Sequence, residues 1–253
     1  MALRNGVLVH GPTAWACAVR LPDGTIKVAA ERKRLVASRV SRPFLRGPAR
    51  LAEAFAVLPA VKRALPEATF PFERPSIMAA MAVSASAARA VRESRLRPVA
   101  QEVATALLAL APAVVLFRGS DLAAYHGAEH ISIGSYEHGE RRAKEHERCG
   151  SHLLGPIVAT QTIAQSLAAH APLRYRGAAR ALAGFGALGL STEIFAWMVR
   201  NPETKLARAL ALPGHELQHR LATAEPTAAQ VEVAEAALRA CLDLEEDAAL
   251  AIA

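Results

Sequence analysis

Long segments rich in alanine, leucine, arginine and glutamate, separated by prolines, make up the chain from residue 51 onward. These residues favour helix, and proline begins or ends a helix because it lacks the backbone N–H. The expected breaks lie at Pro66, Pro71, Pro75, Pro98, Pro112, Pro156 and Pro172. After Pro226, residues 228–244 place apolar side chains near helical spacing. Most of the chain is therefore predicted to be helical.

The first thirty residues have a different pattern. Apolar runs at 6–10, 13–20 and 25–30 are separated by the turn sequences Gly11-Pro12 and Pro22-Asp23-Gly24, which is typical of short paired strands. The predicted fold is mainly α with a small N-terminal antiparallel β element, an α+β class. We expect a single domain over 1–253, with the β subelement at 1–30 and a helical body at 51–253.

The composition excludes several classes of protein. Of the 253 residues, 52% are hydrophobic and three are cysteines, Cys17, Cys149 and Cys241. A disordered chain or a disulfide scaffold would not have this composition. Three widely spaced thiols suggest a reducing compartment, and the N-terminus lacks the apolar run of a secretory signal. A cytoplasmic location is expected, with membrane association as the alternative.

Three nearly apolar stretches raise the question of a membrane. The stretch 103–117 is shorter than the roughly 20 residues that span a bilayer, 177–199 contains Arg180 and Glu193, and 153–171 contains Pro156 and polar residues. We expect buried helices of a soluble or peripherally attached protein, and membrane attachment is the alternative.

Charge is unevenly distributed along the chain. The net charge is +7, with seven basic residues between Arg32 and Arg50 and an acidic C-terminal segment. The basic stretch lacks interleaved aromatics or a zinc-finger spacing, so no specific nucleic-acid binding is expected. A solvated face or a peripheral membrane contact through Arg32–Arg50 is the favoured interpretation, and a homo-oligomer is left open.

Five of the nine histidines fall between residues 126 and 152. His126 and His130 are four residues apart, so a helix would place both imidazoles on one face, within reach of one metal ion. Glu129 completes the order H-x-x-E-H, which zinc peptidases of the inverted type use with the glutamate as general base. The segment 125–152 is therefore the candidate metal site.

Further candidate ligands follow closely, namely Glu137, His146 and Cys149. Together these nitrogen, oxygen and sulfur donors suit zinc or iron. The alternative is a charged surface loop with Cys149 as a small buried side chain. His138 and His152 are candidates for contacts to the ligands. His170, His215 and His219 are expected to be solvated or hydrogen-bonded.

Several blocks of the chain resemble the bacterial YqhQ-type proteins, a group of unknown biochemical function to which metal-dependent enzyme activity is ascribed. The family block G-V-M-M-R-G-P is similar to residues 6–12, R-P-F-L-R-G to 42–47, and R-L-T-T-R-E-P to 220–226. The central blocks Y-H-G-A-E-H-K-T-I, Y-E-x-G and H-P-R-C-G-T are similar to 125–133, 136–139 and 146–151. A G-x-S-Y-E block is similar to 189–193.

The resemblance implies a metal centre on the central block and adds Glu193 as a candidate ligand. Family members are typically integral membrane proteins, whereas the corresponding stretches here are shorter and more polar. The chain departs from the family at Asn5, Ile131, His152 and Thr192. These differences suggest a soluble relative with a different substrate.

The resulting hypothesis is a metal-dependent hydrolase acting on an unknown small molecule or peptide. His126, His130 and a third ligand from Cys149, Glu193 or Glu137 would hold a divalent metal, with zinc favoured and iron as the alternative. Glu129 would act as general base on a metal-activated water. Tyr125, Tyr136 or Arg148 would stabilise developing negative charge.

Two rival hypotheses remain open. A non-haem iron enzyme, an oxidoreductase or lyase, could use the same ligands with a carboxylate. A non-catalytic protein could instead have a closed structural zinc site and a basic surface that binds a membrane or a partner.

Overall fold

A three-stranded antiparallel sheet forms the N-terminal part of the computed structural model, which describes residues 1–34, 36–118 and 121–250. The strands are β1 (Gly6–His10), β2 (Ala14–Arg20) and β3 (Ile26–Arg32), in the order β1-β2-β3. The turn between β2 and β3 uses Gly24 at a φ of 88°, which glycine adopts without strain. The predicted β element is confirmed, and β3 continues two residues beyond the expected end.

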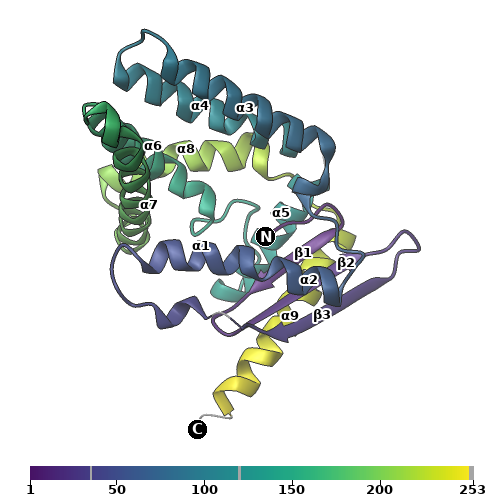
Figure 1. The fold of residues 1–253 in the computed structure, drawn as a ribbon. Coiled ribbons are helices and arrows are strands. Elements are labelled where there is room, and N and C mark those ends of the chain that lie inside the picture. Colours follow the sequence, from purple (N-terminus) through teal and green to yellow (C-terminus); the bar gives the residue numbers. More distant parts are fainter. Residues whose placement is uncertain (35, 119–120, 251–253) are drawn as a thin grey trace.

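Both faces of this sheet are covered (Figure 1). Helices α5 (Asp121–His138) and α9 (Ala228–Leu250) pack against one face, where Val7 and Val9 meet Val233 in a buried cluster. Helix α2 (Leu58–Ala64) packs against the other, where Trp15 and Leu8 belong to a second buried cluster. Successive strand residues point to opposite faces, so one short sheet contributes to two apolar cores. We call the sheet with α2, α5 and α9 the sheet body.

The remaining helices are α1 (Arg46–Ala56), α3 (Pro75–Glu93), α4 (Pro98–Phe117), α6 (Leu154–Ala168), α7 (Arg176–Arg200) and α8 (Lys205–Leu217). Short 3₁₀ turns lie at Ala37–Arg39, Pro71–Glu73, Gly150–Leu153 and Leu173–Tyr175, and a π-helical turn lies at Gln218–Ala222. The predicted class, mainly helical with a small N-terminal antiparallel sheet, is confirmed. The single-domain organisation stays a prediction.

Helix α4 continues through Pro112, so the predicted break there is wrong. Pro112 cannot donate to the carbonyl of Leu108, four residues earlier, and that acceptor would ordinarily be left without a partner. The hydroxyl of Ser84 on α3 donates to this carbonyl at 2.7 Å. The neighbouring helix therefore satisfies the group that proline frees. Pro75 and Pro98 begin helices, as expected from their missing N–H.

The expectation that the long apolar helices are buried is also wrong. Helix α4 and the segment Leu173–Arg200 are long and apolar enough to cross a membrane by length and composition, yet only 11% and 22% of their apolar windows are buried. The polar residues Gln101 and Glu102, which precede the apolar stretch 103–117, are among the buried residues of α4.

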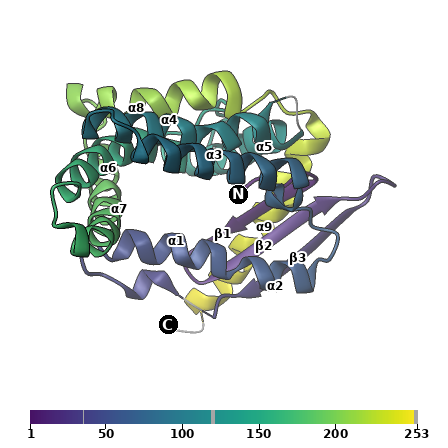
Figure 2. The same ribbon diagram turned by 45° about the horizontal axis from the view of Figure 1, so that its top comes forward.

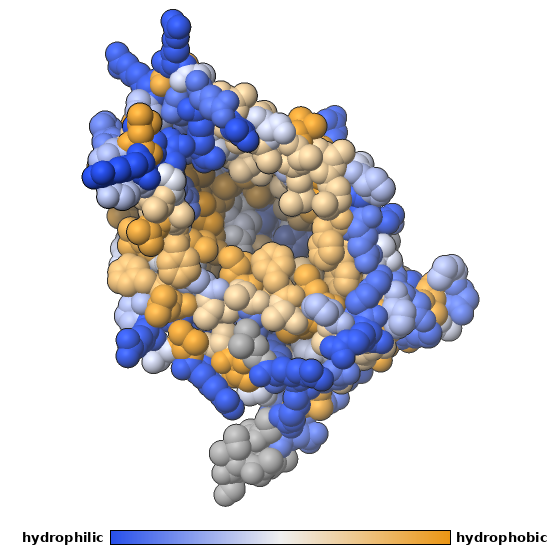
Figure 3. Space-filling view, in the orientation of Figure 1, coloured by the Kyte–Doolittle hydropathy of each residue, from blue (hydrophilic) through white to orange (hydrophobic). Residues whose placement is uncertain are grey.

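Helices α3, α4, α6, α7 and α8 pack on one another, and we call them the helical bundle (Figure 2). Helix α1 lies between this bundle, through α7, and the sheet body, through α2. The space-filling view shows a hollow in this side of the molecule, with apolar side chains around much of its rim (Figure 3).

Candidate metal centre

Helix α5 carries His126 and His130 on one face, one turn apart, with ring centroids 4.3 Å from each other. The helix continues through Gly127, which interrupts the motif in sequence. A Cβ at Gly127 would lie 2.2 Å from the carbonyl oxygen of Ala224. The glycine is thus required by the close approach of another segment, and the helix keeps the spacing of the two histidines.

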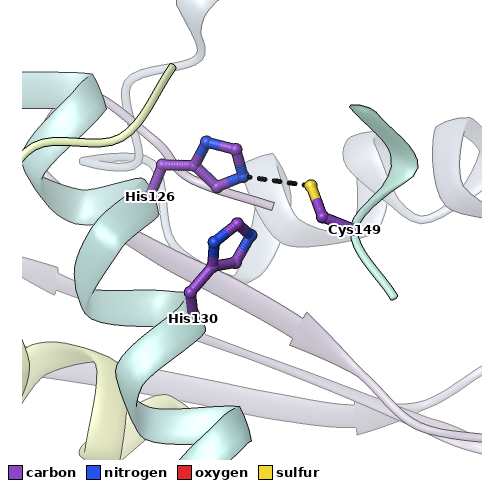
Figure 4. Close-up of side chains that lie close together, drawn as sticks. All are labelled: His126, His130 and Cys149. Atoms are coloured by element: carbon purple, nitrogen blue, oxygen red, sulfur yellow. Dashed lines mark hydrogen bonds between the residues drawn. The ribbon is translucent and has the colours of Figure 1, made fainter. Parts of the chain in front are cut away.

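Cys149 lies opposite the two imidazoles, at the end of the loop that connects α5 to the turn Gly150–Leu153 (Figure 4). Its Sγ is 3.6 Å from Nε2 of His126. One ligand atom from each of His126, His130 and Cys149 lies within 4.8 Å of the others, a group that could hold a metal ion. The structure thus brings two histidines of α5 together with a cysteine of the following loop, which lies 23 positions after His126.

Backbone carbonyls orient both imidazoles. Nδ1 of His126 is 2.8 Å from the carbonyl oxygen of Ala222, and Nδ1 of His130 is 2.7 Å from that of Lys144. A carbonyl oxygen can only accept, so each Nδ1 carries the proton and donates it. This leaves Nε2 of each ring available as a ligand atom, which is the usual arrangement around metal-binding histidines.

The thiol of Cys149 is strongly acidified. Burial by itself raises its pKa, but hydrogen bonding and positive charge from His126 and His130 outweigh burial and lower the pKa to about 4. Burial alone raises the pKa of Cys17 to about 12. At neutral pH Cys149 is therefore a thiolate, the form that binds metals, while Cys17 is an inert thiol.

Glu129 lies beside this group on α5. Its Oε1 forms an ion pair with the α-amino group of Met1, and its Oε2 is buried without a hydrogen-bond partner among the described residues. Burial raises the pKa of this carboxyl, but the α-amino group and the two histidines together hold it below its usual value. The carboxylate is ionised and has one oxygen free to accept a proton or a hydrogen bond.

The sequence matches a known family over residues 118–244, just over half of the chain, and this family is described as a protein of unknown function (DUF1385). The chain belongs to the DUF1385 family. No curated protein and no solved structure matches it. The matched region contains His126, Glu129, His130 and Cys149, so the whole candidate centre lies within the part that defines this family.

Three other predicted site residues form a separate cluster near the three donors. Glu137 accepts from Nε2 of His146 at 3.2 Å and from Arg148 at 3.1 Å. Nδ1 of His146 accepts the backbone N–H of Arg148, so its other nitrogen carries the proton toward Glu137. The His146 ring centroid is 5.6 Å from that of His130. The structure places these residues beside the donor group and not within it.

The remaining predicted residues lie elsewhere. Glu193 on α7 is bound by Arg46 and by the backbone N–H of Phe44. Tyr125 is buried in the core between the sheet, α5 and α9, and burial raises its pKa. Tyr136 is exposed near the end of α5. The structure does not bring these three residues to the donor group.

Several groups that contact the candidate centre lie outside the H-x-x-E-H motif and were not predicted from the sequence. The carbonyls of Ala222 and Lys144 are backbone groups, which no residue pattern reveals. Gln218 and His152 are both buried and are 3.2 Å apart through Nε2 and Nδ1, next to the loop that carries Cys149. Gln218 has no signature in the sequence, because its role depends on a π-helical turn that only the fold defines.

Proposed function

We propose that the protein is a hydrolase that binds one divalent metal ion, with zinc favoured, and uses this ion in catalysis. The proposed ligands are Nε2 of His126, Nε2 of His130 and Sγ of Cys149. The observation that carries the proposal is that two backbone carbonyls accept from Nδ1 of both imidazoles, so that Nε2 of each ring is left to bind a metal ion within reach of Sγ of Cys149. The likeness to YqhQ-type proteins points in the same direction.

One distance between two of the proposed ligand atoms is compatible with a tetrahedral site. Zinc binds thiolate sulfur at about 2.3 Å and imidazole nitrogen at about 2.05 Å, so a tetrahedral angle separates the two ligand atoms by about 3.6 Å. The observed separation between Sγ of Cys149 and Nε2 of His126 is 3.6 Å. Three protein ligands leave a fourth position open, which is the pattern of catalytic rather than structural zinc sites.

When bound, the metal would supply a water molecule of lowered pKa and an electrophilic centre. The residues of the chain supply the rest. Glu129 lies between the two histidines in sequence and interacts electrostatically with both, and its free Oε2 would accept a proton from the attacking water and return it to the leaving group. His130 is buried, and its hydrogen bond to the carbonyl of Lys144 holds its ring in place.

The donor set favours zinc over a non-haem iron centre. The facial arrangement typical of such iron enzymes combines two histidines with a carboxylate, whereas the third donor here is a thiolate. The carboxylates of Glu137 and Glu193 are both engaged by arginines. A closed structural zinc site would need a fourth protein ligand, and the nearest candidate, His146, is turned toward Glu137.

The metal content of the purified protein tests this proposal. Elemental mass spectrometry should find about one zinc per chain in the wild type and none in the His126→Ala/His130→Ala variant. The His170→Ala/His215→Ala variant is the control, because it also removes two histidines, both of which are exposed and lie outside the donor group. We expect this control to keep its metal. A folded, metal-free wild type from metal-replete medium would overturn the proposal.

Catalysis needs its own test. Glu129→Gln should keep the metal and lose hydrolysis of whichever substrate the wild type cleaves in a panel of chromogenic carboxylic esters, phosphate esters and peptides. Removing a general base typically lowers the rate by about 10²–10⁴-fold. A zinc-loaded wild type that cleaves none of these classes, with a fully protein-ligated metal by X-ray absorption, would favour the structural-zinc alternative.

We also propose that the helical bundle contacts a membrane. The interior of this bundle contains polar residues: Glu102 is buried and paired with Arg92 and Arg180, and Gln165 donates to the backbone of α7. Its exterior carries large apolar side chains such as Leu107 and Leu182. A helix whose polar residues face inward and whose apolar residues face outward suits a hydrocarbon environment. The exposed arginines of the Arg32–Arg50 stretch would contact anionic headgroups.

Membrane contact is tested by flotation with vesicles of phosphatidylcholine, with and without phosphatidylglycerol. The wild type should float with both, and more completely with the anionic vesicles. Leu107→Ser/Leu182→Ser should reduce flotation with both kinds, while Arg39→Glu/Arg42→Glu should reduce only the additional binding to anionic vesicles. A wild type that is monomeric without detergent and stays unbound would refute this part of the proposal.

A further inference from the structure

We infer that Gln218 is a positioning residue for the metal centre, and that the π-helical turn Gln218–Ala222 sets the distance between Cys149 and His126. This inference rests on the proposed metal site. It concerns how the third donor is held, which the motif on α5 does not determine.

The side chain of Gln218 is completely buried and contacts the loop before and after Cys149 through its amide group. Its Oε1 accepts the backbone N–H of His146 at 2.8 Å. Its Nε2 lies 2.6 Å from Oγ of Ser151 and 3.2 Å from both the carbonyl of His146 and Nδ1 of His152. All three contacted residues are within three positions of Cys149. One amide therefore fixes the loop before and after the candidate ligand.

The same π-helical turn also orients the opposite ligand. The carbonyl of Ala222, the last residue of the turn, accepts from Nδ1 of His126 at 2.8 Å. Thr223 closes the turn through its hydroxyl and its N–H, which donate to the carbonyl of Gln218 at 2.9 and 3.1 Å. A single short segment thus holds Cys149 through a side chain and His126 through a carbonyl. π-Helical turns occur often at functional sites because the extra residue redirects such groups.

The chemistry of the amide explains why another residue would not serve. An amide both accepts and donates, so it can bind the N–H and the carbonyl of His146 at once. Methionine has a similar length but neither function, and glutamate keeps only the acceptor. Burying a polar group is costly unless it is fully hydrogen-bonded, and all the bonds of this amide go to the loop with Cys149. Gln218 is therefore placed to hold that loop.

The experiment compares Gln218→Met with Gln165→Met, which removes another buried glutamine, located on α6 in the helical bundle. Zinc affinity is measured by competition with a chromogenic chelator, and the cobalt-substituted proteins are examined for the thiolate-to-cobalt charge-transfer band. Gln218→Met should bind zinc about 10–100-fold more weakly, the range typical of contacts that orient ligands, and should show a weakened charge-transfer band. Gln165→Met should retain wild-type values for both.

The outcomes separate this inference from the proposal on which it rests. A wild type that binds no metal refutes the metal site itself. A wild type that binds zinc, with a folded Gln218→Met variant whose affinity and cobalt spectrum match it, refutes only the positioning role. If Gln218→Met does not fold, the near-isosteric Gln218→Glu is judged by the same criteria, because it keeps the acceptor for the N–H of His146. Equal loss in the Gln165→Met control would also overturn the inference.

Discussion

The sheet body and the helical bundle are built with opposite polarity. In the sheet body, Trp15, Leu8 and Val61 are completely or almost completely buried. In the bundle, the buried positions of α4 are Gln101, Glu102 and Thr105, while Leu107 is 65% exposed and Leu182 on α7 is 74% exposed. The apolar core of the sheet body is the arrangement favoured in water, because removing apolar surface from water stabilises the folded state.

One chain therefore combines two regions whose buried residues differ in polarity. The buried residues of the sheet body are mostly apolar, whereas the bundle also buries ion pairs and hydrogen bonds between polar side chains and backbone, beside apolar residues such as Met198. The candidate metal centre lies where the two meet. His126 and His130 come from α5 of the sheet body, and Cys149 comes from a loop that Gln218 holds beside α8. Metal binding would therefore link the two regions.

The largest effect is expected from opening the apolar core of the sheet body. Trp15→Ala should lower the free energy of unfolding by about 4 kcal/mol, because it removes a fully buried aromatic ring and leaves a cavity. Chemical denaturation followed by circular dichroism measures this. Leu8→Ala in the sheet body and Leu107→Ala in the bundle are matched truncations, and the second should change the value far less. Equal losses in the two variants would contradict the contrast between the regions.

Removing the buried charge of the bundle should have the next largest effect. Glu102→Leu leaves Arg92 and Arg180 without their partner, and we expect a loss of about 2 kcal/mol in spite of the greater apolarity of leucine. Chemical denaturation followed by circular dichroism provides the measurement. Glu93→Leu removes the exposed partner of Arg89 and should be nearly neutral. A Glu102→Leu protein as stable as the wild type would show that the polar interior is not needed.

A smaller, pH-dependent effect is expected where α9 meets the turn between β1 and β2. Burial raises the pKa of Glu245, but its hydrogen bonds from Thr13 and Ala14 outweigh burial and hold the pKa below its usual value. Because the folded-state pKa is lowered, the stabilisation is present above the ordinary pKa of glutamate and is lost as the pH falls through the folded-state pKa. Glu245→Gln should cost about 1 kcal/mol at pH 7.

The pH series checks the sign of this prediction. The difference in unfolding free energy between wild type and Glu245→Gln should shrink as the pH is lowered from 7 to 3. The exposed neighbour offers a control, since Glu246→Gln should show little difference at any pH. A difference that grows on acidification would mean that the carboxylate is not stabilised by these bonds.

The smallest effect on stability is expected on the exterior of the bundle. Leu182→Ser should change the unfolding free energy by less than about 0.5 kcal/mol, because the side chain has little contact with the protein. It should nevertheless increase the fraction of protein that remains soluble without detergent, as measured by ultracentrifugation. Val61→Ser, in the core of the sheet body, should do the reverse and lower both stability and solubility.

The candidate site was predictable in part. The spacing of His126 and His130 on a helix predicted these two donors, because i and i+4 positions share a helix face. Cys149 was one of three candidates for the third ligand, beside Glu193 and Glu137, and the structure groups it with the two histidines. The resemblance had added Glu193, and the structure pairs that residue with Arg46. Glu137 and His146 are close in sequence to the donors but bind each other. Sequence proximity gives candidates for ligation, and only side-chain direction selects among them.

The sequence by itself determined the N-terminal strands, the helical remainder and the two histidines on one helix face, because turn residues, helix propensity and residue spacing act locally. The tertiary structure decided which side of each helix is covered, why α4 continues through Pro112, and how Cys149 meets His126. Those features depend on groups far away in sequence, such as the hydroxyl of Ser84 and the amide of Gln218. Hydrogen bonds of this kind form only after the chain has packed, and no local pattern encodes them.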